Sequence, residues 1–454
     1  MQKLKPYFLL LALLTVQILY SAPRLTVVVA VDGLRSDNVE YMREYWLPGG
    51  LRTLQEEASQ AQITYDFNVQ GDDETVATLM TGVQPSTHGL SLNRCFSRKD
   101  RQVHSFFEDK DEQGIGTKEQ VSLKNMNVPT VSDLFRLRYG KFTKIHAVGL
   151  QSSTALLLAG HSANGCCWLD NNTSKWVTTT FYTNGLPSAA DAENMSVRKT
   201  DFYQMPKCNS MAVDLALRIQ QEEGLGMDDT PDLLLLQLSV VKEDAATDCI
   251  QGKDEEDIHQ AVNQYLGFLI EQLQKRVGKA NVQFVVTGIP RHGQSAEQME
   301  RVGIPVRQFN LNRATALTSV YLMAIYGYER WIDGCHGQSV YLNRTLIEEK
   351  GLDLQKMERQ VADFLTDFDG VQAAYPRNEA LMVRELTTGL AKAYIGDVVV
   401  SLLPSWRMMD DEEKETDHVI DSQPDAPLYW LRYDKQPTLP VTFGATRLVH
   451  LLQQ

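Results

Sequence analysis

The 454-residue sequence predicts an α/β fold, with a mostly parallel sheet and helices on both of its faces. Two observations support this prediction. Near-continuous apolar runs recur along the chain, and such runs are typical of parallel strands that are covered on both faces. Helical patterns separate the runs, and an alternation of strands and helices favours a parallel sheet. The clearest runs are residues 25–31, 145–150, 233–238 and 282–286.

The first strand is expected over Leu25–Asp32 and ends in a carboxylate. Ligands of open parallel sheets lie beyond the carboxyl ends of the strands, so Asp32 stands where a site would form. A helix is expected to begin near Glu74. The clearest helix is expected over residues 255–277, where apolar residues at positions i, i+4, i+7, i+8, i+11 and i+15 form one stripe.

The character of the sequence changes at about Arg307. Short strand-like runs and a helical pattern over Leu354–Phe368 predict an inserted α+β subdomain, smaller than the main domain. The chain is then expected to return to the core through Gly396–Trp406. The predicted division is a core at residues 23–306, the inserted subdomain at 307–390, and the rest of the core at 391–454.

The N-terminal residues resemble a secretory signal peptide. Lys3 and Lys5 precede an apolar stretch that ends in the small residues Ser21 and Ala22, which predicts a signal peptide over residues 1–22. The protein is therefore expected to be exported to the periplasm or cell envelope of a bacterium. An uncleaved anchor remains an alternative, although the apolar stretch is shorter than the ~20 residues that a span needs. No second apolar stretch predicts a membrane span in the mature chain.

Charge and cysteine content exclude some partners and leave others open. The formal charge of −14 argues against binding to a nucleic-acid backbone. The six cysteines would permit disulfides in an exported protein, but a sequence cannot pair them. We expect mostly buried thiols, with one or two disulfides left open.

Several segments carry a resemblance to a known family. The chain reads Gly71-Asp-Asp-Glu-Thr-Val-Ala-Thr-Leu-Met-Thr81-Gly82, then Pro85-Ser-Thr-His88-Gly89, and reaches Asn93. Later segments in the same order are Ala159-Gly160-His161, Tyr341-Leu-Asn343 and Gly396-Asp397. This order resembles the alkaline phosphatase superfamily. The closest resemblance is to its secreted two-zinc phosphomonoesterases and nucleotide phosphodiesterases, which have a threonine nucleophile. The resemblance extends over nearly the whole mature chain.

The resemblance implies roles for three positions. The strand-end Asp32 would bind zinc, and Asn93 would contact the substrate phosphate. The nucleophilic threonine would stand nine residues before the Thr81–Gly82 pair, and this position holds Asp72. The chain therefore carries a carboxylate where the family has its nucleophile.

The other positions implied by the resemblance do not match. The expected Asp-x-x-x-His pair falls on Lys242 and Ala246, and the third histidine, expected near residues 424–427, is absent, since His418 lies too early. The expected Asp-His-Gly triplet can be matched only with a two-residue insertion. It then reads Arg291-His292-Gly293, and the basic Lys-x-Arg substrate clamp reads Gln151-Ser-Ser153.

Two interpretations follow. The first is a pseudoenzyme that keeps the fold, has lost the two-zinc centre, needs no cofactor, and acts by binding an envelope protein or glycan. Asp32 would then be a remnant of a metal ligand, Asp72 or Asp73 would cap the helix, and His88 and His161 would hold loops. The alternative is a divergent metal-dependent phosphomonoesterase or phosphodiesterase of the nucleotide pyrophosphatase type. It would use zinc or a hard cation near Asp32 and the acidic helix start.

Overall fold

The computed structural model describes most of the chain. The described residues are 22–67, 72–90, 93–196, 207–241, 253–290, 300, 303–383, 394–409, 415–417, 425–435 and 437–452. The predicted signal peptide therefore lies almost entirely outside them. Among the helices within these ranges, none is both long and apolar enough to cross a membrane.

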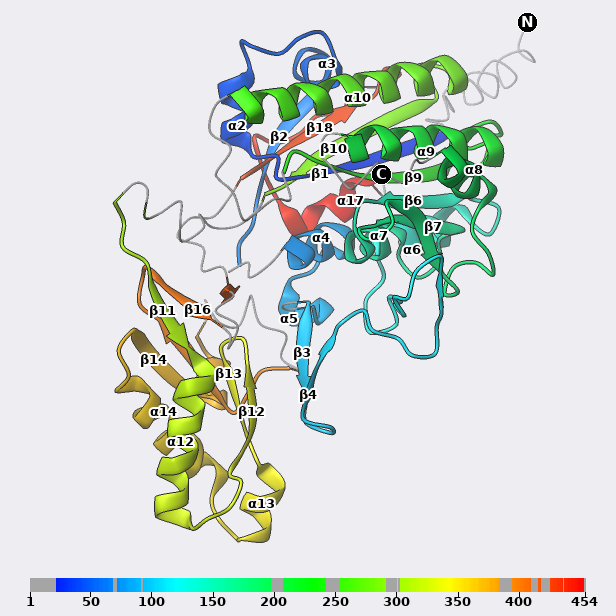
Figure 1. Cartoon of the computed structure of the whole chain (residues 1–454). Helices are drawn as coiled ribbons and strands as arrows, with labels where there is room; N and C mark the ends of the chain where they lie inside the picture. Colours follow the sequence, from blue (N-terminus) through cyan, green and yellow to red (C-terminus); the bar gives the residue numbers. More distant parts are fainter. Residues whose placement is uncertain are drawn as a thin grey trace, which may run out of the picture.

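A ten-stranded sheet forms the centre of the main domain (Figure 1). Its five middle strands, β10-β1-β9-β6-β7, run parallel, whereas β18 and β8 join them in the antiparallel direction. The predicted α/β class is therefore confirmed. In spatial order the strands are β19 (Thr442–Gly444), β2 (Ser59–Thr64), β18 (Ala426–Leu431), β10 (Val282–Ile289), β1 (Leu25–Asp32), β9 (Asp232–Ser239), β6 (Ile145–Gly149), β7 (Gly165–Asp170), β8 (Lys175–Thr179) and β5 (Gly114–Ile115).

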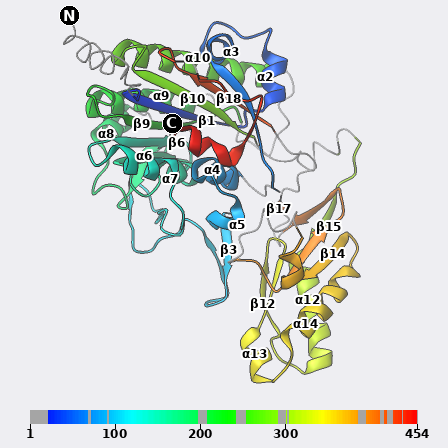
Figure 2. The same cartoon turned by 180° about the vertical axis from the view of Figure 1, so that it is seen from behind.

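Helices cover both faces of this sheet (Figures 1 and 2). The side chains of β1 alternate between the faces. Val27 and Val29 belong to the apolar cluster that includes α9 and α10 residues, whereas Val28 and Ala30 belong to the cluster that includes α4 and α7 residues. Since every residue of β1 is buried, the strand reads as one continuous apolar run. The covering helices include α2 (Ser36–Met42), α3 (Gly50–Glu57), α9 (Lys207–Glu223) and α10 (Lys253–Val277) on one face, and α4 (Asp72–Thr81), α6 (Val131–Tyr139), α7 (Ser152–Ala159) and α17 (Leu448–Leu452) on the other.

The inserted subdomain has its own apolar core and two small sheets. A four-stranded sheet has the order β12-β13-β15-β14, and a three-stranded sheet has the order β11-β16-β17. The strands are β11 (Arg307–Asn310), β12 (Ile332–His336), β13 (Ser339–Leu342), β14 (Val371–Pro376), β15 (Val398–Leu402), β16 (Trp406–Met409) and β17 (Glu415–Asp417). The helices are α12 (Leu311–Tyr326), α13 (Arg344–Glu349), α14 (Leu354–Thr366) and α15 (Arg377–Ala380).

The subdomain ends later in the chain than the sequence indicated. We expected the core to resume at residue 391, through a strand over Gly396–Trp406. That strand, β15, instead pairs with β13 and β14 of the subdomain, and the chain re-enters the large sheet only with β18. The apolar run of β15 looks like a core strand because it is buried in the subdomain's own core.

A hairpin of the main domain contacts the subdomain. Its strands are β3 (Arg94–Ser97) and β4 (Gln102–Ser105), and the turn between them carries Arg98. The Arg98 guanidinium donates to Oδ2 of Asp397, a fully buried carboxylate, at 2.7 Å. Asp397 also accepts from Arg344 at 2.7 Å and from the backbone N–H of Leu342 at 2.6 Å. One buried carboxylate thus joins the hairpin to the subdomain.

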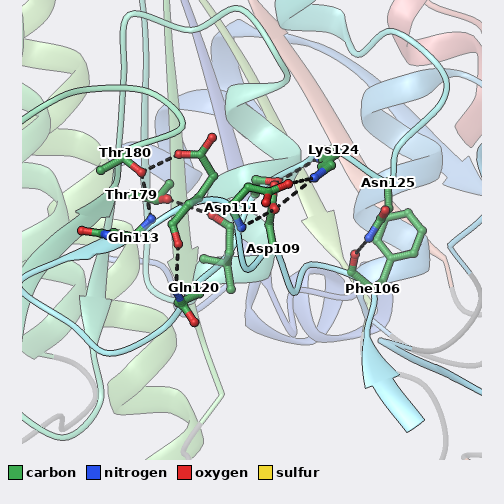
Figure 3. A network of polar contacts seen from close by, with 12 residues as sticks. Phe106, Asp109, Asp111, Gln113, Gln120, Lys124, Asn125, Thr179 and Thr180 are labelled. Carbon is green, nitrogen blue, oxygen red and sulfur yellow. Dashed lines mark hydrogen bonds and ion pairs between the residues drawn. The ribbon is translucent and has the colours of Figure 1, made fainter. Parts of the chain in front are cut away.

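The loop that follows this hairpin is held by a polar network (Figure 3). The Lys124 ammonium lies 3.2 Å from Asp109 and 2.5 Å from Asp111. Ser122 donates to the second oxygen of Asp109 at 2.6 Å, and this carboxylate is buried. The lysine therefore occupies the position between two carboxylates where a cation would otherwise be attracted.

The described cysteines are free thiols. Cys166, Cys167 and Cys208 are buried, whereas Cys95 and Cys335 are partly exposed, and Cys249 lies outside the described residues. Burial raises the pKa of Cys167 to about 12, which keeps this thiol protonated.

Candidate functional site

Asp32 lies at the carboxyl end of β1, at the centre of the sheet. The parallel register places it beside Ser239 of β9 and Ile289 of β10. The Ser239 hydroxyl donates to Asp32 Oδ2 at 3.2 Å. Ser239 is itself fixed by Asn209 of α9, whose amide bonds both the N–H and the C=O of Ser239 at 2.8 Å. Asp32 is only 5% exposed, so a strand-end carboxylate is held in a defined and largely dry position.

A second carboxylate, Asp73, lies in the first turn of α4, near enough to Asp32 for the two charges to interact. The pKa of Asp73 is raised to about 6, first by burial and then by the neighbouring negative charge of Asp32. Ser153 of α7 opposes this rise in the pKa because its hydroxyl is hydrogen-bonded to the Asp73 carboxylate. The counted motif pointed to Asp72 as the nucleophile position, and its neighbour Asp73 is the residue whose pKa responds to the charge of Asp32.

Ser153 comes from the segment where the resemblance implied two basic residues. It is buried near the start of α7 and bonds Asp73 with a neutral hydroxyl. The residues that the structure brings together here are therefore two carboxylates, Asp32 and Asp73, and two hydroxyls, Ser153 and Ser239. This group of atoms is negative at neutral pH and offers oxygen atoms.

Two histidines of the matching motifs are engaged in structural hydrogen bonds. His88 is completely buried, and burial lowers its pKa to about 3, so the ring is neutral. Its Nδ1 accepts from the N–H of Leu90, which places the proton on Nε2, 3.2 Å from the Thr78 hydroxyl. His161 bonds Asp133 through Nδ1 at 2.8 Å and the carbonyl of Met126 through Nε2 at 2.9 Å.

Asn93 is placed at the base of the β3–β4 hairpin. Its side-chain oxygen accepts from the Ser105 hydroxyl at 3.0 Å, and its carbonyl accepts from the N–H of Phe106 at 2.7 Å. These contacts tie Asn93 to the hairpin. Within the described part of the chain, no contact joins it to Asp32 or Asp73, so its proposed role toward a phosphate stays a prediction.

The two-zinc centre that the resemblance implied stays untested, because most of the positions that would supply its ligands lie outside the described residues. Zinc sites use nitrogen, sulfur and carboxylate ligands, with at least three of them from the protein. Among the described residues, no group of three or more His, Cys, Asp and Glu side chains could hold a metal ion. The mismatched positions Lys242, Ala246, Arg291, His292 and His418 lie outside the described residues.

Sequence reasoning placed Asp73 near Asp32 only as one of the acidic residues at the helix start, and it missed Ser239 and Asn209 altogether. A signal for Ser239 was present, because it ends the apolar run of β9 just as Asp32 ends that of β1. Parallel neighbours bring such strand ends together. No comparable signal existed for Asn209, which lies in the first turn of α9.

Known structures share this arrangement of strands and helices. The crystal structure of the alkaline phosphatase PafA superposes with a TM-score of 0.80 at 19% identity, covering 95% of this chain and 96% of that one. Phosphonoacetate hydrolase of Sinorhizobium meliloti superposes with a TM-score of 0.56 at 14% identity, covering 95% of each chain. The protein therefore has the fold of the alkaline phosphatase superfamily.

Sequence comparison agrees with this superfamily and identifies a family within it. PafA of Elizabethkingia meningoseptica is 22% identical over 402 residues, which cover 75% of this chain and 72% of PafA. Alkaline phosphatase PhoV of Synechococcus elongatus is 23% identical over 460 residues, which cover 85% of this chain and 80% of PhoV. Residues 26–425 match the family described as type I phosphodiesterase / nucleotide pyrophosphatase. The chain belongs to this family.

Proposed function

We propose that this chain is a noncatalytic member of its family, exported to the bacterial cell envelope, where it acts by binding an envelope protein or glycan. The observation that carries the proposal is the pair of carboxylates formed by Asp32, at the end of β1, and Asp73, in the first turn of α4. The family's chemistry needs a nucleophile, metal ligands and cationic donors for the phosphate at this place. Here the contacts around Asp73 come from a second carboxylate and a serine hydroxyl.

Electrostatics supports this proposal. A phosphate ester carries about one to two negative charges at neutral pH. Two unit charges of the same sign at about 4 Å repel by about 4 kcal/mol near a protein surface. A phosphate beside Asp32 and an ionised Asp73 would meet this repulsion, and Ser153 supplies no positive charge to offset it. The site thus disfavours the substrate class that the fold usually serves.

A second candidate rests on the same residues. Carboxylate and hydroxyl oxygens are ligands for hard cations such as Mg²⁺. A cation held by Asp32 and Asp73 would neutralise the pair and permit a divergent metal-dependent phosphomonoesterase or phosphodiesterase. The two candidates differ in whether the purified protein retains a metal.

The test is the metal content of the purified protein after loading with zinc or magnesium and desalting, measured by plasma mass spectrometry. Hydrolysis of an aryl phosphate monoester and diester is measured on the same samples. The matched variants are Asp32→Asn and, as a control, Asp363→Asn, which removes an exposed carboxylate from α14. We expect substoichiometric metal and equal background hydrolysis in all three proteins. Stoichiometric metal, with hydrolysis lost only in Asp32→Asn, would establish the second candidate instead.

A further inference from the structure

A cavity of about 520 Å³ lies between the β3–β4 hairpin of the main domain and the inserted subdomain. Its walls come from the hairpin, from α12 and from β12, whereas the carboxylate pair lies at the ends of β1, α4, α7 and β9. Ligand sites of proteins typically measure about 300–1,000 Å³, so the volume suits a small organic molecule. The lining side chains that matter for recognition are Arg94, Arg101, Thr315, Arg330 and Asp333.

The cavity is positively charged in a protein that is acidic overall. Three arginines line it against one carboxylate, Asp333. Arg101 pairs with Asp333 at 2.7 Å, which offsets one of the three positive charges. Arg330 donates to the backbone carbonyls of Ile332 and Asp333 at 3.3 and 2.8 Å, which fixes its guanidinium in the wall without neutralising it. The chain as a whole carries a formal charge of −14, so this excess is local.

A buried hydroxyl on α12 also lines the cavity. Thr315 is 7% exposed, and its Oγ1 has no hydrogen-bond partner within the described part of the chain. Helical threonines commonly donate their hydroxyl to a backbone carbonyl one turn earlier. Thr318 on the same helix does so, since its hydroxyl donates to the carbonyl of Ala314 at 2.8 Å. A buried polar group without a partner is costly and rare in native proteins. The Thr315 hydroxyl is covered in the unliganded protein, so a ligand in the cavity would bond it after a small rotation of the side chain.

The backbone of the β3–β4 hairpin also favours a binding role for this cavity. Arg101 has a φ of 59°, in the left-handed region that residues other than glycine, asparagine and aspartate seldom adopt. A glycine would meet the turn's backbone requirement at lower cost. Arginine at this position brings a guanidinium to the cavity wall.

We propose that this cavity binds a phosphate monoester of a small molecule, of about the size of a sugar phosphate. Such a group carries about −1.5 to −2 charges at pH 7, which matches the excess of two arginines over the carboxylate. Guanidinium groups bond phosphate oxygens in a planar, bidentate manner. The apolar part of the lining, Phe96, Val103 and Ile332, would contact the body of the molecule. This inference uses neither Asp32 nor Asp73 and stands apart from the proposed function.

The test is calorimetric titration of the full protein with glucose 6-phosphate, with glucose and glucose 6-sulfate as comparison ligands. The variant Arg94→Gln removes an exposed cavity arginine, and its matched control is Arg313→Gln, an exposed arginine on α12 outside this cavity. We expect one saturable site for glucose 6-phosphate, no binding of glucose, and weaker binding of the singly charged sulfate ester. Arg94→Gln should raise Kd about tenfold or more, as loss of a charge-assisted hydrogen bond implies. Arg313→Gln should change Kd less than about twofold.

A second pair of variants separates ligand binding from a structural role. Thr315→Val should raise Kd several-fold without lowering the melting temperature, because the lost hydroxyl has no partner to lose in the unliganded protein. Thr318→Val should lower the melting temperature and leave Kd unchanged. The variant Asp73→Asn should also leave Kd unchanged, which distinguishes this cavity from the strand-end site. Absence of saturable binding, an unchanged Kd in Arg94→Gln, or equal affinity for the sulfate ester would each overturn the assignment.

Discussion

Replacing Asp73 by asparagine should stabilise the protein at alkaline pH. The pKa of Asp73 is raised from 3.8 to about 6, so the folded protein binds this proton more tightly than the unfolded chain does. The stability contributed by Asp73 is therefore fully present below about pH 3.8 and is lost as the pH rises through about 6. A difference of about two pK units corresponds to at most about 3 kcal/mol. Because the side chain is partly hydrated, we expect Asp73→Asn to gain about 1–2 kcal/mol at pH 8.

The assay is urea unfolding of the wild type and of Asp73→Asn at pH 8 and pH 5. At pH 5 most Asp73 side chains are protonated, so the advantage of asparagine should shrink toward zero. Asp363→Asn, an exposed control, should stay within about 0.5 kcal/mol of the wild type at both pH values. If the pair holds a metal ion in the native protein, Asp73→Asn would instead destabilise it at pH 8, and a chelator would abolish the difference. That result would refute both the reasoning about repulsion and the noncatalytic proposal.

Two further predictions concern structural ion pairs. Asp397→Asn leaves Arg98 and Arg344 without their buried partner charge, so we expect the free energy of unfolding to fall by about 3–5 kcal/mol. Urea titration measures this loss. A loss below about 1 kcal/mol would contradict the role of this carboxylate. The pKa of His161 is raised by its hydrogen bond to Asp133, so its contribution is present below pH 6.5 and is lost as the pH rises through the higher folded pKa. The stability difference between wild type and His161→Asn should therefore shrink between pH 6 and pH 9 in thermal melts, and a constant difference would disprove the charged pair.

The strands of the large sheet could be predicted because local sequence is enough to define them. A strand buried on both faces is apolar at nearly every position, and the run ending at Asp32 meets that condition without reference to any other residue. The end of the inserted subdomain could not be predicted in the same way. Val398–Leu402 is just as apolar, but which sheet it joins depends on β13 and β14, its partners across the fold.

The site was only partly predictable, and helix geometry explains why. Counting from Thr81–Gly82 finds the start of α4, but successive helical residues point about 100° apart. A count therefore cannot decide which of the acidic residues at the start of α4 interacts with Asp32. The partners of the pair, Ser153 and Ser239, come from two other elements, so their proximity follows from the order of strands in the sheet rather than from spacing.

The structure also explains how the site could change while the fold persisted. The two apolar clusters that hold the sheet are built from apolar residues of the strands and from the helices. Most of the apolar packing that stabilises the domain therefore lies away from the polar residues at the ends of β1 and β9. If the chain no longer binds oxyanions there, the arginines around the cavity at the inserted subdomain offer the complementary charge elsewhere. On this argument Arg94→Gln should weaken phosphate-ester binding, and Asp73→Asn should not. The reverse pattern would show that the ester binds beside Asp32 and Asp73 instead.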